Sequence, residues 1–125
     1  MKIGFNEGCN RFCAGQSVLD DLALCEKYGF DYIDVQSECL DRDLAAGKYT
    51  LEDLASFFKT HHLKMLSYNA LIFFNMKGTR AEKDAVLAQL DEIVRRCRML
   101  GGGMIVVVPS MDLKTPATRG EIRPD

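Results

Sequence analysis

The sequence lacks a strong charge of either sign, and it lacks any apolar run long enough to cross a bilayer. Lys and Arg number 16 and Asp and Glu number 18, so the formal net charge is -2 over 125 residues. This balance excludes an electrostatic preference for nucleic acid or for an anionic membrane. The longest apolar runs, such as MIVVVP at 104–109, are far shorter than the roughly 20 residues of a transmembrane helix.

The sequence also lacks the features of a secreted protein. Its first residues, MKIGFNEG, turn polar after five positions, which does not fit a signal peptide. No CxxC pair occurs, and the cysteines are odd in number, so we expect reduced, partly buried thiols and no disulfide framework. We therefore expect a cytoplasmic protein. The cysteines are Cys9, Cys13, Cys25, Cys39 and Cys97.

Common catalytic and cofactor patterns are missing as well. No Ser/His/Asp or Cys/His arrangement can be built, so no catalytic residue is assigned. Gly101–Gly103 precede an expected strand rather than a helix, which does not fit a phosphate cradle. Gly78, Thr79 and Arg80 precede an expected helix, where an anion site and a plain N-cap are both open and the N-cap is favoured.

No metal site is evident from residue spacing. Neighbouring helical residues point about 100° apart, so His61 and His62 are better explained as the end of a helix than as joint ligands. Glu7, Asp34 and Glu38 are carboxylates of the right type, but no His accompanies them at a convincing spacing.

What the sequence does contain is a regular alternation of strand and helix patterns. Strands are expected at residues 2–7, 32–36 and 104–110, and along a stretch from Leu63 whose strand ends near Asn69. Three helices are expected, each opening with a hydroxyl residue and an acid three positions later. These pairs are Ser17 with Asp20, Thr50 with Asp53, and Thr79 with Glu82. Residues 37–49 are expected to be a polar connection.

The resulting order is βαβαβαβ, which predicts an α/β fold with parallel strands and right-handed crossovers. Two architectures remain open from this pattern: the first half of a (β/α)8 barrel, and a small doubly wound sheet. A complete flavodoxin-like domain is a weaker alternative, because no phosphate loop follows the first strand.

Polar residues gather where the expected strands end, and parallel strands would bring these ends to one rim. One interpretation is a small pocket for a polyhydroxylated ligand, with Phe73 and Phe74 as an apolar wall. The other is ordinary loop polarity, and the pattern does not choose between them. The polar residues are Asn6, Glu7, Gln36, Asn69, Asn75 and Ser110.

Four segments of the chain are distinctive: FNE at 5–7, LALCEKYGFDYIDV at 22–35, LEDLASFFKTHHLKMLSYNALIFFN at 51–75 and LGGGMIVVVPS at 100–110. Together they resemble the 2-keto-myo-inositol (inosose) isomerases of inositol catabolism. These enzymes are xylose isomerase-like TIM barrels, a superfamily of sugar isomerases and epimerases that includes the endonuclease IV type of enzyme. The resemblance implies that residues 1–125 are a partial barrel domain with strands one to four and helices one to three.

The resemblance also implies a site and a chemistry. Asn6, Glu7, Gln36, Asn69, Phe73 and Pro109 would face a small sugar or polyol ketone. In the whole family barrel, a divalent metal assists proton transfer beside the carbonyl, held by Glu, Asp, His and Glu on later strands. No position in this chain matches those four ligands. We therefore expect no metal on this chain and no activity from it alone.

Stopping after the fourth strand would leave open sheet edges, which invite pairing with another chain. The sequence is thus expected to be part of a longer isomerase or epimerase, which we favour, or a chain that self-associates through those edges. The alternative function is a non-catalytic half-barrel that acts as an oligomerising or ligand-binding module.

Overall fold

The computed structural model describes residues 1–10, 13, 15–72 and 78–108 of the 125. Strands and α-helices alternate along most of this chain, with a short 3-10 helix, η1, directly after the first strand. The elements are β1 (Gly4–Asn6), η1 (Glu7–Cys9), α1 (Val18–Tyr28), β2 (Tyr32–Gln36), α2 (Ser37–Ala45), α3 (Leu51–Thr60), β3 (Lys64–Ile72), α4 (Arg80–Leu100) and β4 (Met104–Val108).

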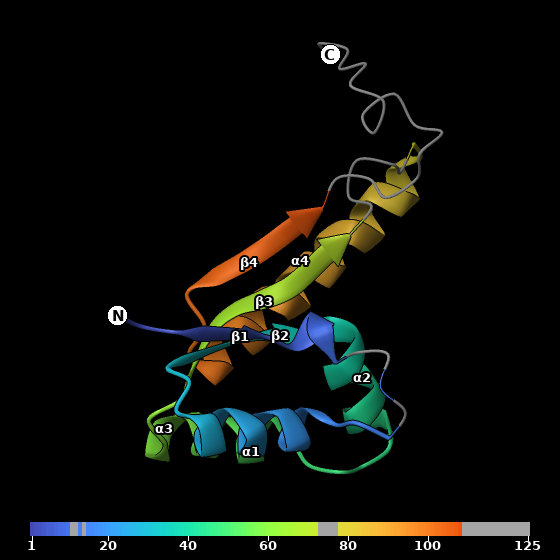
Figure 1. Ribbon diagram of the computed structural model, residues 1–125. Helices are drawn as coiled ribbons and strands as arrows, with labels where there is room; N and C mark the ends of the chain where they lie inside the picture. The colour runs from blue at the N-terminus through green and yellow to red at the C-terminus, as the bar shows by residue number, and fades with distance from the viewer. Residues whose placement is uncertain (11–12, 14, 73–77, 109–125) are drawn as a thin grey trace.

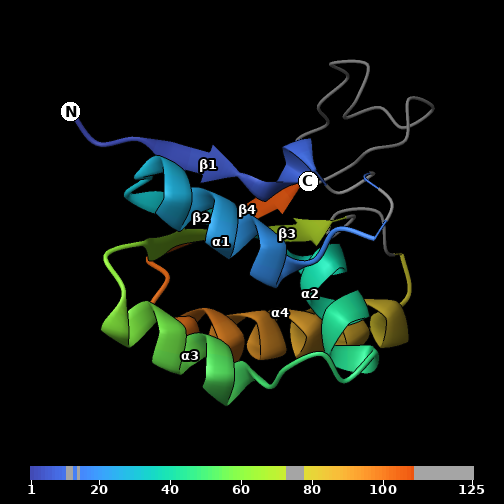
Figure 2. The ribbon, with the colours of Figure 1, turned by 60° about the horizontal axis from the view of Figure 1, so that its bottom comes forward.

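The four described strands form one parallel sheet in the order β1-β2-β3-β4. The α-helices of the described residues, α1 to α4, lie on one side of this sheet, as Figures 1 and 2 show. A doubly wound sheet has helices on both faces and a strand order that reverses at a switch point. Sequential order with one-sided helices is the arrangement of a (β/α)8 barrel, so the structure confirms the half-barrel prediction.

The three predicted helix starts are confirmed. Ser17, Thr50 and Thr79 are N-caps, and each forms a capping box with the acid three residues later. The reciprocal hydrogen bonds satisfy backbone donors that a helix start otherwise leaves free. Gly29 and Gly101 end α1 and α4 with φ of 71° and 79°, a left-handed conformation that favours glycine.

The expected polar connection at 37–49 is wrong in part, because it contains α2. Leu40 and Leu44 lie four residues apart and pack inward, which is a helical spacing. The apolar stripe is hard to see in the sequence because Asp43, on the same side, is also fully buried. The helix therefore has a polar residue in the middle of its buried face.

The third strand also differs from expectation, because it does not end at Asn69. Asn69 pairs with Gln36 on β2 and with Val106 on β4, so both neighbouring strands support it. The strand continues to Ile72, with a register shift against β4 between Asn69 and Leu71. Pairing on both sides outweighs the low strand preference of asparagine.

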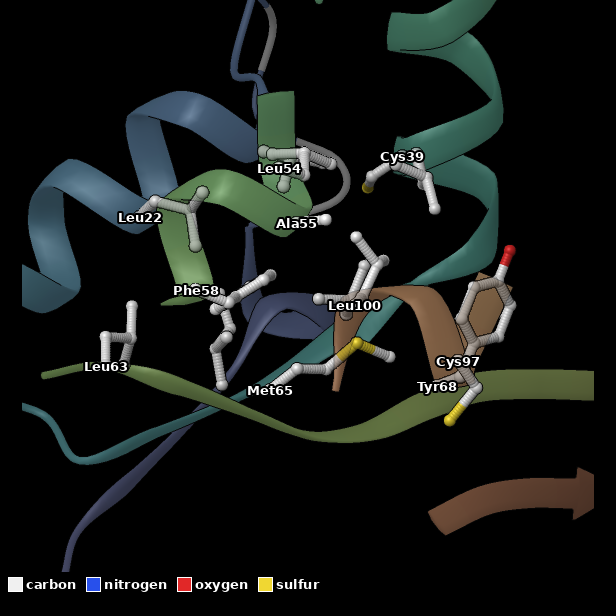
Figure 3. Close-up of a cluster of buried hydrophobic side chains, with 14 of the residues drawn as sticks. Leu22, Cys39, Leu54, Ala55, Phe58, Leu63, Met65, Tyr68, Cys97 and Leu100 are labelled. Carbon is white, nitrogen blue, oxygen red and sulfur yellow. The ribbon is translucent and has the colours of Figure 1, made fainter. Parts of the chain in front are cut away.

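The core is the apolar layer between the sheet and its helices (Figure 3). Leu22 from α1, Leu54 and Phe58 from α3, and Leu100 from α4 meet the sheet side chains Ile33 and Met65. Cys25, Cys39 and Cys97 are buried, whereas Cys9 and Cys13 are exposed, and all five thiols are free. This confirms the expectation of partly buried thiols, and their reduced state stays a prediction.

The last described strand is less covered than the others. Met104, Val106 and Val107 are between 37% and 52% exposed. β4 pairs with β3 on one side, and among the described residues no strand pairs with its other side. Within the described ranges, no helix combines the length and the apolar character needed to cross a membrane.

Leu22 and Leu19 provide a matched test of this core, because both are on α1 but only Leu22 is buried. Leu19 is 41% exposed and Leu22 is 1% exposed. Leu22→Ala is expected to lower the free energy of unfolding by about 2–5 kcal/mol through lost burial and a residual cavity. Leu19→Ala is expected to lower it by about 1 kcal/mol or less. Urea denaturation of both variants measures the difference, and equal losses would contradict the placement of α1.

Candidate ligand-binding site

A pocket of about 550 Å³ lies at the carboxyl ends of the strands. Such ends are where ligands bind in parallel α/β folds, and the volume lies within the usual range for small-molecule sites. The residues around it come from β1, β2, β3 and β4, and from η1, α2 and α4. They are Asn6, Gly8, Cys9, Gln36, Ser37, Glu38, Asp41, Asn69, Ala70, Ile72, Gln89 and Val108.

Two amide side chains on neighbouring strands are joined on the wall of this pocket. The Gln36 side-chain amide donates to Asn6 Oδ1 at 3.2 Å, and Gly8 N donates to the same oxygen at 2.8 Å. A Cβ on Gly8 would lie 2.8 Å from Asn6 Oδ1 and 3.1 Å from Gln36 Nε2, so only glycine fits there without displacing the pair. We call Asn6 and Gln36 the amide pair.

Glu7 lies behind the amide pair rather than on the open rim. Its side chain is fully buried, and its Oε2 accepts a hydrogen bond from Gln36 N at 2.6 Å. Its Oε1 is buried without a hydrogen-bond partner among the described residues. Burial raises the pKa of Glu7 to about 8; Asp21 and Asp43 add to this rise, and the Gln36 N–H and Arg42 oppose it.

The first turns of α2 form the acidic side of the pocket. Ser37 Oγ accepts a hydrogen bond from Ala70 N at 3.3 Å, which ties α2 to β3. Asp41 accepts a hydrogen bond from Arg96 of α4, and Arg96 also donates to Tyr68 OH at 3.2 Å. Asp41 is therefore paired. Glu38 is exposed, and no Lys or Arg belongs to the described pocket lining.

Buried Asp21 and the side chain of Arg42 hold the segment that connects η1 to α1. Asp21 Oδ1 accepts hydrogen bonds from the Asn10 and Gln16 side chains at 2.7 and 2.9 Å. Arg42 donates to Gln16 O at 2.8 Å. Asn10 and Gln16 are thus attached to α1 and α2, which holds the wall of the pocket that η1 provides.

Asp43 fastens α1 to α2. It is fully buried and accepts from Val18 N and Lys48 Nζ at 2.8 Å each, from Tyr49 OH at 3.2 Å and from Arg42 Nε at 3.3 Å. Burial opposes its charge, but the hydrogen bonds from Lys48, Val18 and Arg42 outweigh burial and lower its pKa below the usual value.

The two histidines contact different residues and do not act as a pair, as expected. The His61 ring stacks on Phe57 at 3.9 Å and its Nδ1 lies 3.0 Å from Phe57 O, at the end of α3. His62 Nε2 lies 2.8 Å from Asp31 Oδ1. Asp34, one of the carboxylates considered for a metal, accepts a hydrogen bond from Ser67 Oγ at 2.6 Å. In the described part of the chain, no three His, Cys, Asp or Glu residues form a metal-binding group.

The structure brings together three of the six residues proposed to face a substrate. Asn6, Gln36 and Asn69 line one pocket, and Glu7 is buried behind it. Phe73 and Pro109 lie outside the described residues. For all six residues, a role in binding a substrate stays a prediction. Sequence reasoning missed Ser37, Asp41 and Gln89. The first two belong to the unexpected α2, and Gln89 lies within α4, away in sequence from the strand ends where polar residues were expected to gather.

A profile of the family described as "Xylose isomerase-like TIM barrel" matches residues 22–123. The chain belongs to the xylose isomerase-like TIM barrel family.

Particular relatives are inosose isomerases. The chain is 36% identical over 110 residues to the inosose isomerase of Bacillus velezensis and 31% identical to that of Halalkalibacterium halodurans. It is also similar, with 35% identity and a TM-score of 0.77, to the crystal structure of the IolI protein with a binding zinc atom. Each match covers 87% of this chain, which spans about 38% of the length of the curated relatives.

Asp43→Asn tests the connection between α1 and α2. The amide cannot accept from all four donors, and each buried donor left without a partner costs about 1–3 kcal/mol. Because the folded-state pKa of Asp43 is lowered, its stabilisation is present above the usual value of 3.8 and is lost as pH falls through the lowered value. The variant is therefore expected to lose stability at neutral pH and to show a shallower decline in acid.

The control is Asp84→Asn on α4. Asp84 pairs with Arg80, but both side chains are more than half exposed, so the expected loss is below about 1 kcal/mol. Thermal unfolding of both variants between pH 2 and 7 measures the two effects. An Asp43→Asn variant as stable as Asp84→Asn would contradict the role given to the buried carboxylate.

Proposed function

We propose that this chain forms part of the substrate pocket of an isomerase or epimerase of the inosose isomerase type. The observation that carries the proposal is the convergence of Asn6, Gln36 and Asn69 from three parallel strands on one pocket. The identity of up to 36% with inosose isomerases supports the choice of ligand class. The ligand in this proposal is a neutral polyol ketone such as 2-keto-myo-inositol.

The chemistry of the pocket favours such a ligand. Each Asn or Gln side chain offers both a donor group and an acceptor oxygen, and a sugar hydroxyl also needs both. Amides on three strands can therefore hold adjacent hydroxyls of one ring in a defined orientation. A phosphorylated sugar is less suitable, because Glu38 is exposed at the pocket and no described lining residue carries a positive charge.

The described residues do not supply a metal site for the reaction. A ketone–hydroxyl isomerisation in this family would depend on a divalent ion, and no group of three ligands exists in the described ranges. We therefore assign to this chain the binding and orientation of the hydroxyl groups. We expect no isomerisation by the chain alone, and we place the protein in the cytoplasm.

Binding can be tested through Cys9, because this exposed thiol lines the pocket. Saturating 2-keto-myo-inositol at pH 7 is expected to slow alkylation of Cys9 by iodoacetamide severalfold, measured by peptide mass spectrometry. Cys13 is exposed but does not belong to the described pocket lining, so its rate is the internal control. Asn69→Ala is expected to abolish the protection. Equal Cys9 rates with and without the ketone would contradict the proposal, and so would stronger protection by a phosphorylated sugar.

A second candidate function, self-association, is supported by the exposure of β4. Met104, Val106 and Val107 are partly exposed on a strand that pairs on only one side within the described chain. Sedimentation velocity is expected to show association that rises with concentration and is abolished by Val106→Lys. A wild-type chain that sediments as a monomer at every concentration would remove this candidate and leave the pocket proposal unaffected.

A further inference from the structure

Glu7 occupies an unusual position relative to the pocket. It is the first residue of η1, between Asn6 and Gly8, and both of these neighbours line the pocket. Its own side chain turns into the interior and is fully buried. The short helix therefore has a pocket residue on either side of Glu7, and the buried carboxyl group attaches η1 to β2.

The carboxyl group of Glu7 supplies a hydrogen-bond acceptor that β1 does not provide to β2. β1 ends at Asn6, which pairs with Asp34, so Gln36 at the end of β2 has no partner on β1. Glu7 Oε2 accepts from Gln36 N at 2.6 Å and so fills the place of a strand carbonyl. The same Gln36 donates its side-chain amide to Asn6. Glu7 thus fixes both the backbone and, through it, the side chain of the pocket residue.

We propose that Glu7 is a positioning residue, which holds the amide pair in its binding geometry as a neutral carboxylic acid and releases it on losing its proton. The part of this inference that concerns ligand affinity rests on the proposed function. The part that concerns the geometry of Gln36 does not.

The surroundings of Glu7 favour the neutral form. Two buried carboxylates face it, Asp21 from α1 and Asp43 from α2, and Arg42 is the opposing cation. The Cys25 and Cys39 thiols and the Tyr49 hydroxyl are also close, and burial raises the pKa of all three. With its pKa raised to about 8, Glu7 is neutral at pH 7. Above pH 8 a third buried negative charge would arise beside Asp21 and Asp43. The Gln36 N–H favours this charge, but burial and the two neighbouring carboxylates outweigh that hydrogen bond, and turning η1 outward would relieve the charge.

The contribution of Glu7 to folding stability and its effect on the position of the amide pair change over different pH ranges. Glu7 binds a proton in the folded state up to about pH 8 but in the unfolded state only up to about its ordinary value of 4.5. Its contribution to stability therefore declines as pH rises from 4.5 to 8 and then levels off. The positioning effect begins only where the folded state loses the proton, at about pH 8 and above. A purely structural acid would show the first change without the second.

The experiment is an NMR titration of the whole chain between pH 6 and 10. In the wild type, the Gln36 backbone and side-chain amide resonances are expected to shift with the Glu7 carboxyl carbon, with one midpoint near pH 8. The dissociation constant of 2-keto-myo-inositol is expected to rise above that midpoint by up to about tenfold per pH unit, the limit for one proton. Glu7→Gln keeps an acceptor for Gln36 N without the charge, and is expected to remove both pH dependences.

The matched control is Glu52→Gln, which changes an exposed acid in the first turn of α3 and is expected to keep both pH dependences. Gln36 resonances that stay constant from pH 6 to 10 in the wild type would overturn the inference without any variant. Binding with an unchanged dissociation constant would overturn it too, while leaving the proposed function intact. Absence of binding at every pH, with Gln36 still titrating with Glu7, would remove the proposed function and support the positioning role.

Discussion

The rest of the structure depends on the apolar layer between the sheet and its helices. Burial of aliphatic side chains contributes roughly 1.5–3 kcal/mol each, which is large compared with a net stability of about 5–15 kcal/mol. Ile33 and Val35 of β2 and Met65 of β3 face this layer, so the alternate residues of the same strands face away from the helices. Asp34 and Gln36 are such alternate residues, and Ser67 lies on the same face as its partner Asp34 because the register between β2 and β3 shifts after Ile33 and Met65. Packing of the core therefore determines which polar side chains lie on the face of the sheet away from the helices.

Three buried acids are accommodated in three different ways. Asp43 is surrounded by four donors and keeps its charge, and Asp21 accepts from two amide side chains. Glu7 has one backbone donor, and burial dominates its surroundings, so its pKa rises to about 8. A buried carboxylate needs several donors to remain charged. The difference in donor number therefore accounts for the opposite directions in which the pKa values of Asp43 and Glu7 move.

Local signals in the sequence were sufficient for the main features of the fold. Capping pairs such as Thr79 with Glu82 were enough to predict where the helices begin, because these hydrogen bonds join residues only three positions apart. The alternation of strand and helix patterns was enough to predict parallel strands. Helix α2 was missed because Asp43 interrupts its apolar stripe, and the donors that satisfy Asp43 come from Val18, Lys48 and Tyr49, partly far along the chain. The burial of Glu7 was missed for the same reason, since its partner Gln36 is 29 residues away.

The face of the sheet away from the helices changes character across its width. Register places Asn6, Asp34 and Ser67 in one row that ends at Met104, and Gln36 and Asn69 in the next row that ends at Val106. In a (β/α)8 barrel, helices form the outer ring and this face turns inward. A barrel interior is usually filled by branched apolar side chains, which fits β4 but not the polar rows of β1–β3. Polar side chains there need hydrogen-bond partners, and a ligand rich in hydroxyl groups would provide them at the strand ends.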